Sequence, residues 1–72
     1  MRKVPYTEIG IRRLKCFRCN SPAKYQWQIC SDGNVYHPLC PRCDVELNEM
    51  VLQFMGFEDW KEKMIIYREL KL

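Results

Sequence analysis

The stretch CFRCNSPAKYQWQICSDGNVYHPLCPRC, residues 16–43, holds all five cysteines and the only histidine of the 72-residue chain. Two Cys-x2-Cys pairs within it are separated by 20 residues. Pairs at this spacing are typical of a tetrahedral zinc site, and four thiolates leave no open position for a catalytic water. We therefore predict one structural Zn²⁺ ion. Its predicted ligands are Cys16, Cys19, Cys40 and Cys43.

The size of the chain makes such a metal important for folding. A chain of 72 residues forms at most one domain and buries a small core, so domains of this size commonly rely on a metal or on disulfides. An odd number of cysteines argues against a closed disulfide framework. No apolar run follows the first five residues, which argues against a secretory signal, and no stretch is long and apolar enough to span a membrane. We expect a cytoplasmic protein with reduced thiols.

The elements around the cysteines follow from local patterns. Residues 1–15 form a basic lead-in, and their segment VPYTEIGI is predicted to be extended or turned because it contains a proline and a glycine. Residues 24–39 alternate apolar and polar side chains in the manner of a β-hairpin. Asp32 and Gly33 suit a turn with positive φ, and Pro38 limits the return strand.

Two helices are expected after the hairpin. Pro41 suits the first helical position, which places Cys40 at the N-cap, and Gly56 suits the C′ position. A second amphipathic helix is expected from about residue 58 to residue 70. The first helix carries apolar residues at spacings of three and four, which predicts one apolar face. Those residues are Leu47, Met50, Val51, Phe54 and Met55.

A cysteine turn, a hairpin and a helix that carries the second Cys-x2-Cys pair in its first turn resemble the treble-clef zinc fingers. Within that group the chain is most similar to the GATA type, because Trp27 follows Cys19 by eight residues and PLCPRC leads into the second pair. The resemblance covers residues 16 to about 55. It implies a small α+β zinc-binding domain with a treble clef over 16–56, a basic N-terminal arm over 1–15 and an added amphipathic helix over 57–72.

Two departures from the GATA pattern change what the resemblance implies. The 20 residues between the pairs exceed the usual GATA loop, which predicts an extended hairpin. The helix that would read DNA carries Asp44, Glu46 and Glu49, and phosphates would repel it, so GATA-type reading of the major groove is not carried over. The whole chain also resembles small treble-clef proteins of bacteria and their phages, a likeness that implies no particular activity.

The charge distribution suggests nucleic-acid binding as the first function. Residues 1–24 contain seven basic residues and one acidic residue, whereas residues 25–72 contain five basic and eight acidic residues. A polyanion such as DNA or RNA would therefore meet the front half of the chain. The predicted phosphate contacts are Arg2, Lys3, Arg12, Arg13, Lys15, Arg18 and Lys24.

The helical aromatic residues suggest an alternative, in which the chain is a protein-interaction adaptor or a small inhibitor. An amphipathic surface of this kind would bind a protein partner or a second copy of the chain, and the competing interpretation is that the second helix folds back and completes the core. The predicted interface residues are Phe54, Phe57, Trp60, Met64 and Tyr67.

We expect no enzymatic activity and no small-molecule substrate. The chain has no Gly-rich phosphate loop and no pair of carboxylates beside a nucleophile. Cys30 is interpreted as a thiol without a metal role, the alternative being a spare ligand or a redox contact. His37 is interpreted as a strand histidine that makes one hydrogen bond or faces solvent, the alternatives being a metal ligand or a nuclease residue.

Overall fold

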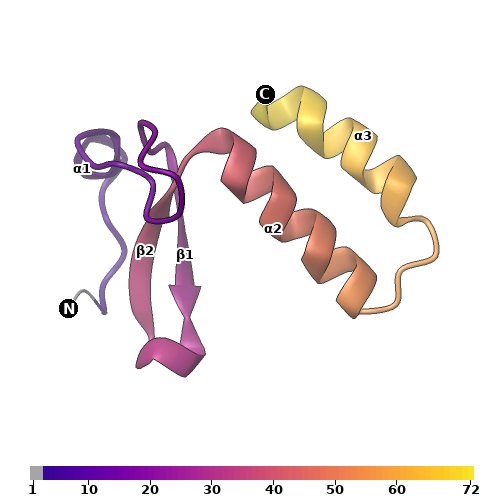
Figure 1. Ribbon diagram of the computed structural model, residues 1–72, viewed down its shortest axis with the longest axis horizontal. Coiled ribbons are helices and arrows are strands. Elements are labelled where there is room, and N and C mark those ends of the chain that lie inside the picture. The colour runs from indigo at the N-terminus through magenta and orange to yellow at the C-terminus, as the bar shows by residue number, and fades with distance from the viewer. Residues whose placement is uncertain (1–2) are drawn as a thin grey trace.

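The computed structural model describes residues 3–72. Its elements follow the order α1, β1, a short 3-10 helix, β2, α2 and α3 (Figure 1). Their bounds are Glu8–Arg12, Tyr25–Ile29, Cys30–Asp32, Val35–Leu39, Pro41–Phe54 and Trp60–Lys71. The strands form an antiparallel hairpin, α2 diverges from the hairpin, and α3 returns alongside α2 (Figure 1). The molecule is a small α+β fold shaped as an open V.

The hairpin pairs Tyr25 with Leu39 and Ile29 with Val35. The return strand covers VYHPL as predicted and contains Pro38, because each strand of a two-stranded sheet has an outer edge where a proline is tolerated. The carbonyl of Pro38 uses that edge to accept a hydrogen bond of 2.9 Å from the amide of Phe17. This bond joins the first cysteine turn to β2.

The hairpin turn differs in detail from the prediction. Asp32 ends the 3-10 helix, and positive φ values occur one residue later, at Gly33 (69°) and Asn34 (63°). Glycine adopts this conformation without strain, and asparagine is among the residues that tolerate it best. The turn is thus longer than a two-residue connection and extends the hairpin.

The prediction that VPYTEIGI is extended or turned was wrong for its second half, which forms α1. The side chain of Thr7 caps this helix by accepting a hydrogen bond of 3.0 Å from the amide of Gly10. A Cβ atom on Gly10 would lie only 2.9 Å from Thr7 Oγ1. The glycine therefore leaves room for the capping hydroxyl rather than breaking the helix.

Helix α2 has the termini that the sequence predicts. Cys40 is the N-cap, Pro41 occupies the first turn, and Gly56 has a positive φ of 79°. The amides of Gly56 and Phe57 donate to the carbonyls of Gln53 and Leu52, in the pattern of a Schellman motif. This motif ends α2 and turns the chain back toward α3.

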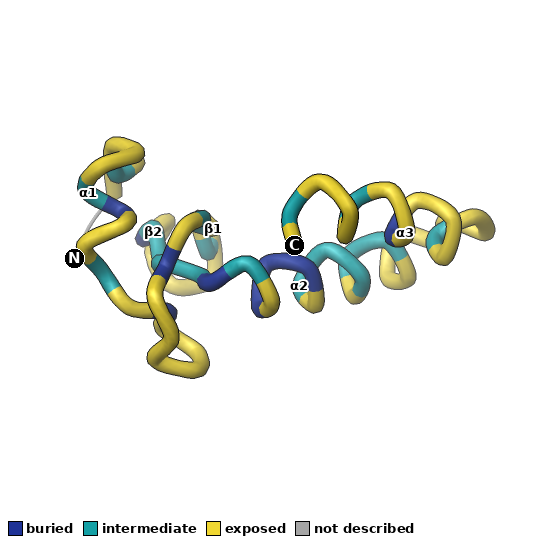
Figure 2. Tube along the Cα trace, turned by 90° about the horizontal axis from the view of Figure 1, so that it is seen from above, coloured by how far each residue is buried: buried dark blue, intermediate teal, exposed yellow. Residues whose placement is uncertain are grey.

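Helix α3 begins at Trp60, two residues later than expected, and packs against α2. Met64 is its most buried residue, with 2% of its surface exposed. Arg68 forms an ion pair of 2.8 Å with Glu49 on α2. The start of α2 is buried, whereas the far ends of α2 and α3 are mostly exposed (Figure 2).

Apolar residues of α2 do not form the single buried face that the sequence predicts. Asp44 and Asn48 contact α3, whereas Leu47 and Met50 line a hollow shared with the hairpin. Phe54 is 88% exposed at the end of α2. The helix therefore has one side covered by α3 and a second apolar side that is uncovered.

Candidate metal centre

The first cysteine pair lies in a tight turn that backbone hydrogen bonds hold together. The carbonyl of Cys16 accepts from the amide of Asn20 at 2.9 Å, and the amide of Cys16 donates to the carbonyl of Ser21 at 2.6 Å. Asn20 has a positive φ of 66°, which asparagine tolerates. This local geometry folds Cys19 back beside Cys16.

The second pair lies where β2 passes into α2. Cys40 Sγ accepts a hydrogen bond of 3.4 Å from the amide of Cys43, so the thiol also caps the helix. A cap residue and the residue three positions later face each other across the first helical turn. The start of α2 therefore fixes the separation of these two sulfurs.

All four predicted ligand sulfurs meet at one point. They lie within 4.8 Å of one another, with Cys19 Sγ 3.4 Å from Cys40 Sγ and 3.6 Å from Cys43 Sγ. A tetrahedral zinc with Zn–S bonds of about 2.3 Å requires sulfur separations of about 3.8 Å. A disulfide requires about 2.05 Å. The cluster therefore fits one tetrahedral metal ion and holds four free thiols.

The thiols differ in acidity before a metal binds. Hydrogen bonds from Ser21 lower the pKa of Cys19 to about 6, and the Cys40 thiol adds to the effect. Burial, together with the neighbouring cysteine sulfurs, raises the pKa of Cys43 to about 12. Four thiols so close together cannot all lose their protons unless a cation lies between them. A bound divalent cation would supply that charge.

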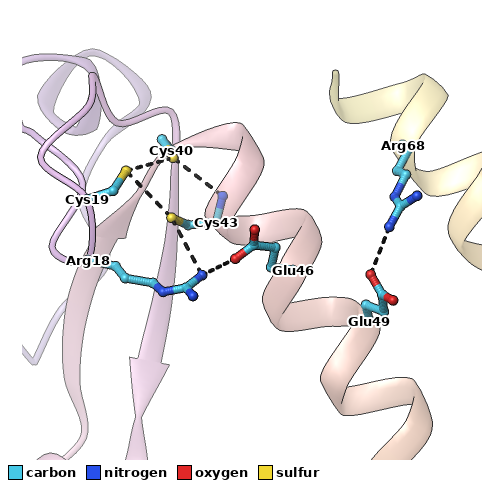
Figure 3. Close-up of polar contacts among 7 residues, drawn as sticks. All are labelled: Arg18, Cys19, Cys40, Cys43, Glu46, Glu49 and Arg68. Carbon is cyan, nitrogen blue, oxygen red and sulfur yellow. Dashed lines mark hydrogen bonds and ion pairs between the residues drawn. The ribbon is translucent and has the colours of Figure 1, made fainter.

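Arg18 belongs to this centre. Its guanidinium lies 4.0 Å from Cys43 Sγ and forms an ion pair with Glu46, one turn along α2 (Figure 3). A cation beside a thiolate offsets part of the excess negative charge of a four-cysteine site. Arg18 was predicted to contact phosphates, and that role stays a prediction, because the side chain is 62% exposed while it pairs with Glu46.

A buried polar cluster of Asp44, Asn48 and Tyr67 adjoins the four cysteines, and the sequence analysis did not predict it. Asp44 follows Cys43 and is only 5% exposed. Its carboxylate accepts a hydrogen bond of 2.5 Å from Tyr67, whose hydroxyl also accepts one of 3.1 Å from Asn48. Burial and the Asp44 carboxylate raise the pKa of Tyr67 well above its usual range. An acidic residue near a helix start usually reflects the helix dipole, so only long-range contacts reveal this role.

Two of the remaining predicted phosphate contacts, Arg12 and Lys24, lie close together. Arg2 lies outside the described residues, and Lys3, Arg13 and Lys15 are exposed. Arg12 and Lys24 line a shared hollow of about 550 Å³, which Lys71 of α3 also lines. The basic arm is attached to the fold, because the backbone of Tyr6 and the side chain of Gln26 exchange two hydrogen bonds.

The predicted interface residues divide into exposed and packed positions. Phe54 and Phe57 are exposed, whereas Trp60 is half-buried. Met64 is buried and Tyr67 is bonded to Asp44, so neither presents a free apolar surface. The helix α3 folds back on α2 through these two residues.

Cys30 and His37 lie outside the sulfur cluster. Cys30 is exposed and begins the 3-10 helix. His37 Nε2 lies 2.7 Å from the carboxylate of Asp32, and the His37 ring contacts the ring of Phe17 at 4.3 Å between centroids. The interpretation of His37 as a strand histidine with one hydrogen bond agrees with this geometry.

Comparisons with known proteins leave the site to be interpreted on its own geometry. No family model matches the chain, and neither a curated protein nor a solved structure matches it. Within residues 3–72, no helix is both long enough and apolar enough to cross a membrane.

Proposed function

We propose that the chain is a treble-clef zinc finger in which one Zn²⁺ is structural. The order of cysteine turn, hairpin and helix, and the sulfur separations near those of a ZnS4 tetrahedron, support this assignment. All four sulfurs of the cluster would be ligands and would leave no open metal position. The metal would therefore stabilise the fold, and the working surface would lie elsewhere. The absence of enzymatic activity stays a prediction.

The working surface that we propose binds nucleic acid. The observation that carries this proposal is a cationic and aromatic hollow built from three separate segments. Lys71 Nζ lies 4.2 Å from the centre of the Tyr25 ring and Lys24 Nζ lies 5.7 Å from it, while Arg12 lines the same hollow. Lysines and arginines bind phosphates, and a tyrosine face can stack on a base.

Two acidic residues also line this hollow and limit its charge. Asp44 is buried beneath Tyr67, and Glu8 forms an exposed ion pair of 3.0 Å with Arg12. An exposed pair of this type contributes little energy and exchanges readily for a phosphate contact. The hollow therefore keeps a cationic rim for a polyanion.

The test is a titration of labelled single- and double-stranded DNA and RNA with zinc-loaded protein at two salt concentrations. Affinity is expected to fall steeply with salt, and the double variant Lys24→Ala, Lys71→Ala should lower the slope by about one per lost phosphate contact. The matched control is Lys61→Ala, Lys63→Ala, which removes equal charge elsewhere on α3. Binding that ignores salt, or that both variants weaken equally, would contradict the proposal.

A second candidate function is binding to protein. The observation that favours it is a groove of about 490 Å³ between the hairpin and α2, with largely apolar walls. Exposed apolar surfaces of this kind mark interfaces. This groove and the cationic hollow share Trp27 and otherwise have different lining residues.

A further inference from the structure

The groove between the hairpin and α2 is an apolar feature that the fold leaves uncovered. One wall comes from β1 and β2, the other from α2, and Phe17 of the cysteine turn also lines the groove. Met50 on the helix wall is 67% exposed. The apolar residues that line the groove are Phe17, Trp27, Ile29, Leu39, Leu47 and Met50.

The helix wall has the repeat of a helix–helix seam. Leu47, Met50 and Phe54 are spaced by three and four residues, which is the spacing that lets two helices pack along a line. Helix α3 does not use this seam, because it contacts the opposite side of α2 through Asp44 and Asn48. The seam therefore has no partner within residues 3–72.

The molecule exposes more surface than a compact monomer of its mass, and the difference is of the size that a dimer contact would cover. The accessible surface is 5585 Å², whereas a compact monomer of 8.8 kDa is expected to expose about 4,800 Å². The radius of gyration is 12.8 Å, compared with about 11 Å for a compact chain of this length. The excess of about 800 Å² equals the area that each partner loses in an interface of standard size.

We propose that a second copy of the chain occupies this groove and forms a two-fold symmetric dimer. A two-fold contact needs one surface that carries both a projection and a matching recess. Phe54 projects from the end of α2, about 10 Å along the helix from Leu47 in the groove. Antiparallel packing of the two α2 helices about Met50 places Phe54 of each copy over the Leu47 wall of the other.

This inference deepens the protein-binding role and is independent of nucleic-acid binding. The dimer buries Phe54, which is 88% exposed in the monomer, against the apolar groove between the hairpin and α2. The modest net charge of +3 presents little repulsion between two copies. Arg12, Lys24, Tyr25 and Lys71 of the cationic hollow do not line the groove, and Trp27 is the one residue that lines both.

Sedimentation equilibrium of the zinc-loaded full chain, from micromolar to millimolar concentration, tests the proposal. Wild type is expected to dimerise, and Phe54→Glu and Met50→Glu are each expected to weaken self-association at least about tenfold. Far-UV circular dichroism verifies that both variants stay folded, as their exposure predicts. The matched control is Ile66→Glu on α3, where an isoleucine that is 61% exposed lies outside the groove and should leave dimerisation unchanged.

A photo-crosslinking amino acid at position 54, in a mixture of isotopically light and heavy protein, locates the contact. The expected product joins position 54 of one copy to residues 27–29 or 47 of the other. A wild-type protein that stays monomeric overturns the proposal, as does a dimer that Phe54→Glu leaves intact. Failure here would leave the nucleic-acid proposal standing, because that proposal is measured by its own salt titration.

Discussion

The hydroxyl of Tyr67 donates a hydrogen bond of 2.5 Å to the carboxylate of Asp44, the residue that follows Cys43 of the sulfur cluster. This bond joins the last helix to the first turn of α2, where the metal centre lies. Asn48 donates to both the Tyr67 hydroxyl and the backbone carbonyl of Asp44, which closes the cluster. The C-terminal helix and the metal centre are therefore coupled through buried polar contacts as well as apolar packing.

Removing the Tyr67 hydroxyl should destabilise the fold. Tyr67→Phe leaves the buried Asp44 carboxylate with one donor fewer, which costs about 1–3 kcal/mol. The measurement is the free energy of unfolding in urea at a fixed excess of zinc. The control Tyr36→Phe removes the same hydroxyl from β2 and should have a smaller effect. Equal stability of the Tyr67 variant and wild type would show that the hydrogen bond contributes nothing.

Arg18 should strengthen metal binding through its charge. Arg18→Ala removes the cation beside Cys43 Sγ and leaves Glu46 facing the thiolates, so zinc affinity should fall about tenfold. Competition with a chromophoric chelator measures this change. Arg13→Ala, an equal loss of charge on the exposed end of α1, should not weaken binding. Glu46→Gln should not weaken it either, and a loss equal to that of Arg18→Ala would refute the electrostatic explanation.

Metal affinity should depend on pH, because protons and zinc compete for the same sulfurs. The metal-free pKa of Cys43 is raised to about 12, so this thiol is protonated at neutral pH and must release its proton when zinc binds. Affinity should therefore rise with pH and be lost in acid, and zinc addition should acidify a weakly buffered solution. An apparent affinity that stays constant between pH 6 and 8 (about the physiological range) would contradict thiolate ligation.

Thr7 and Gly10 should act as a coupled pair in α1. Gly→Ala in a helix normally stabilises by roughly 0.5–1 kcal/mol, but a Cβ on Gly10 would displace the Thr7 cap, 2.9 Å away. Gly10→Ala should therefore give little gain in wild type and its full gain in a Thr7→Ala background. Amide hydrogen exchange of residues 8–12 in the four proteins measures this difference. Additive effects would mean that the cap and the glycine are independent.

The metal centre could be predicted from the sequence because its geometry is local. Each Cys-x2-Cys pair is fixed by a tight turn or by the first turn of a helix, and both have sequence signatures. The caps of α2 followed for the same reason, with Cys40, Pro41 and Gly56 in the expected places. Only the closure of the hairpin was needed to bring the two pairs together.

Contacts between distant segments could not be predicted in this way. Lys71 lies over the ring of Tyr25, and Arg18 reaches Glu46, because the chain folds back twice. The sequence pattern of α2 assigned Leu47 and Val51 to one apolar face, since periodicity does not reveal that two different neighbours share a helix. The helix α1 was not predicted, because a glycine usually disfavours a helix and the packing of Gly10 against the Thr7 hydroxyl is visible only in the structure.

X-ray absorption spectroscopy at the zinc edge, on the zinc-loaded full chain, tests the central claim most directly. The account predicts a first shell of four sulfur atoms at about 2.3 Å and no nitrogen. Stoichiometric zinc should be retained, and its removal by a chelator should unfold the protein. A first shell that contains a histidine nitrogen, or a chain that keeps its fold without metal, would contradict the account.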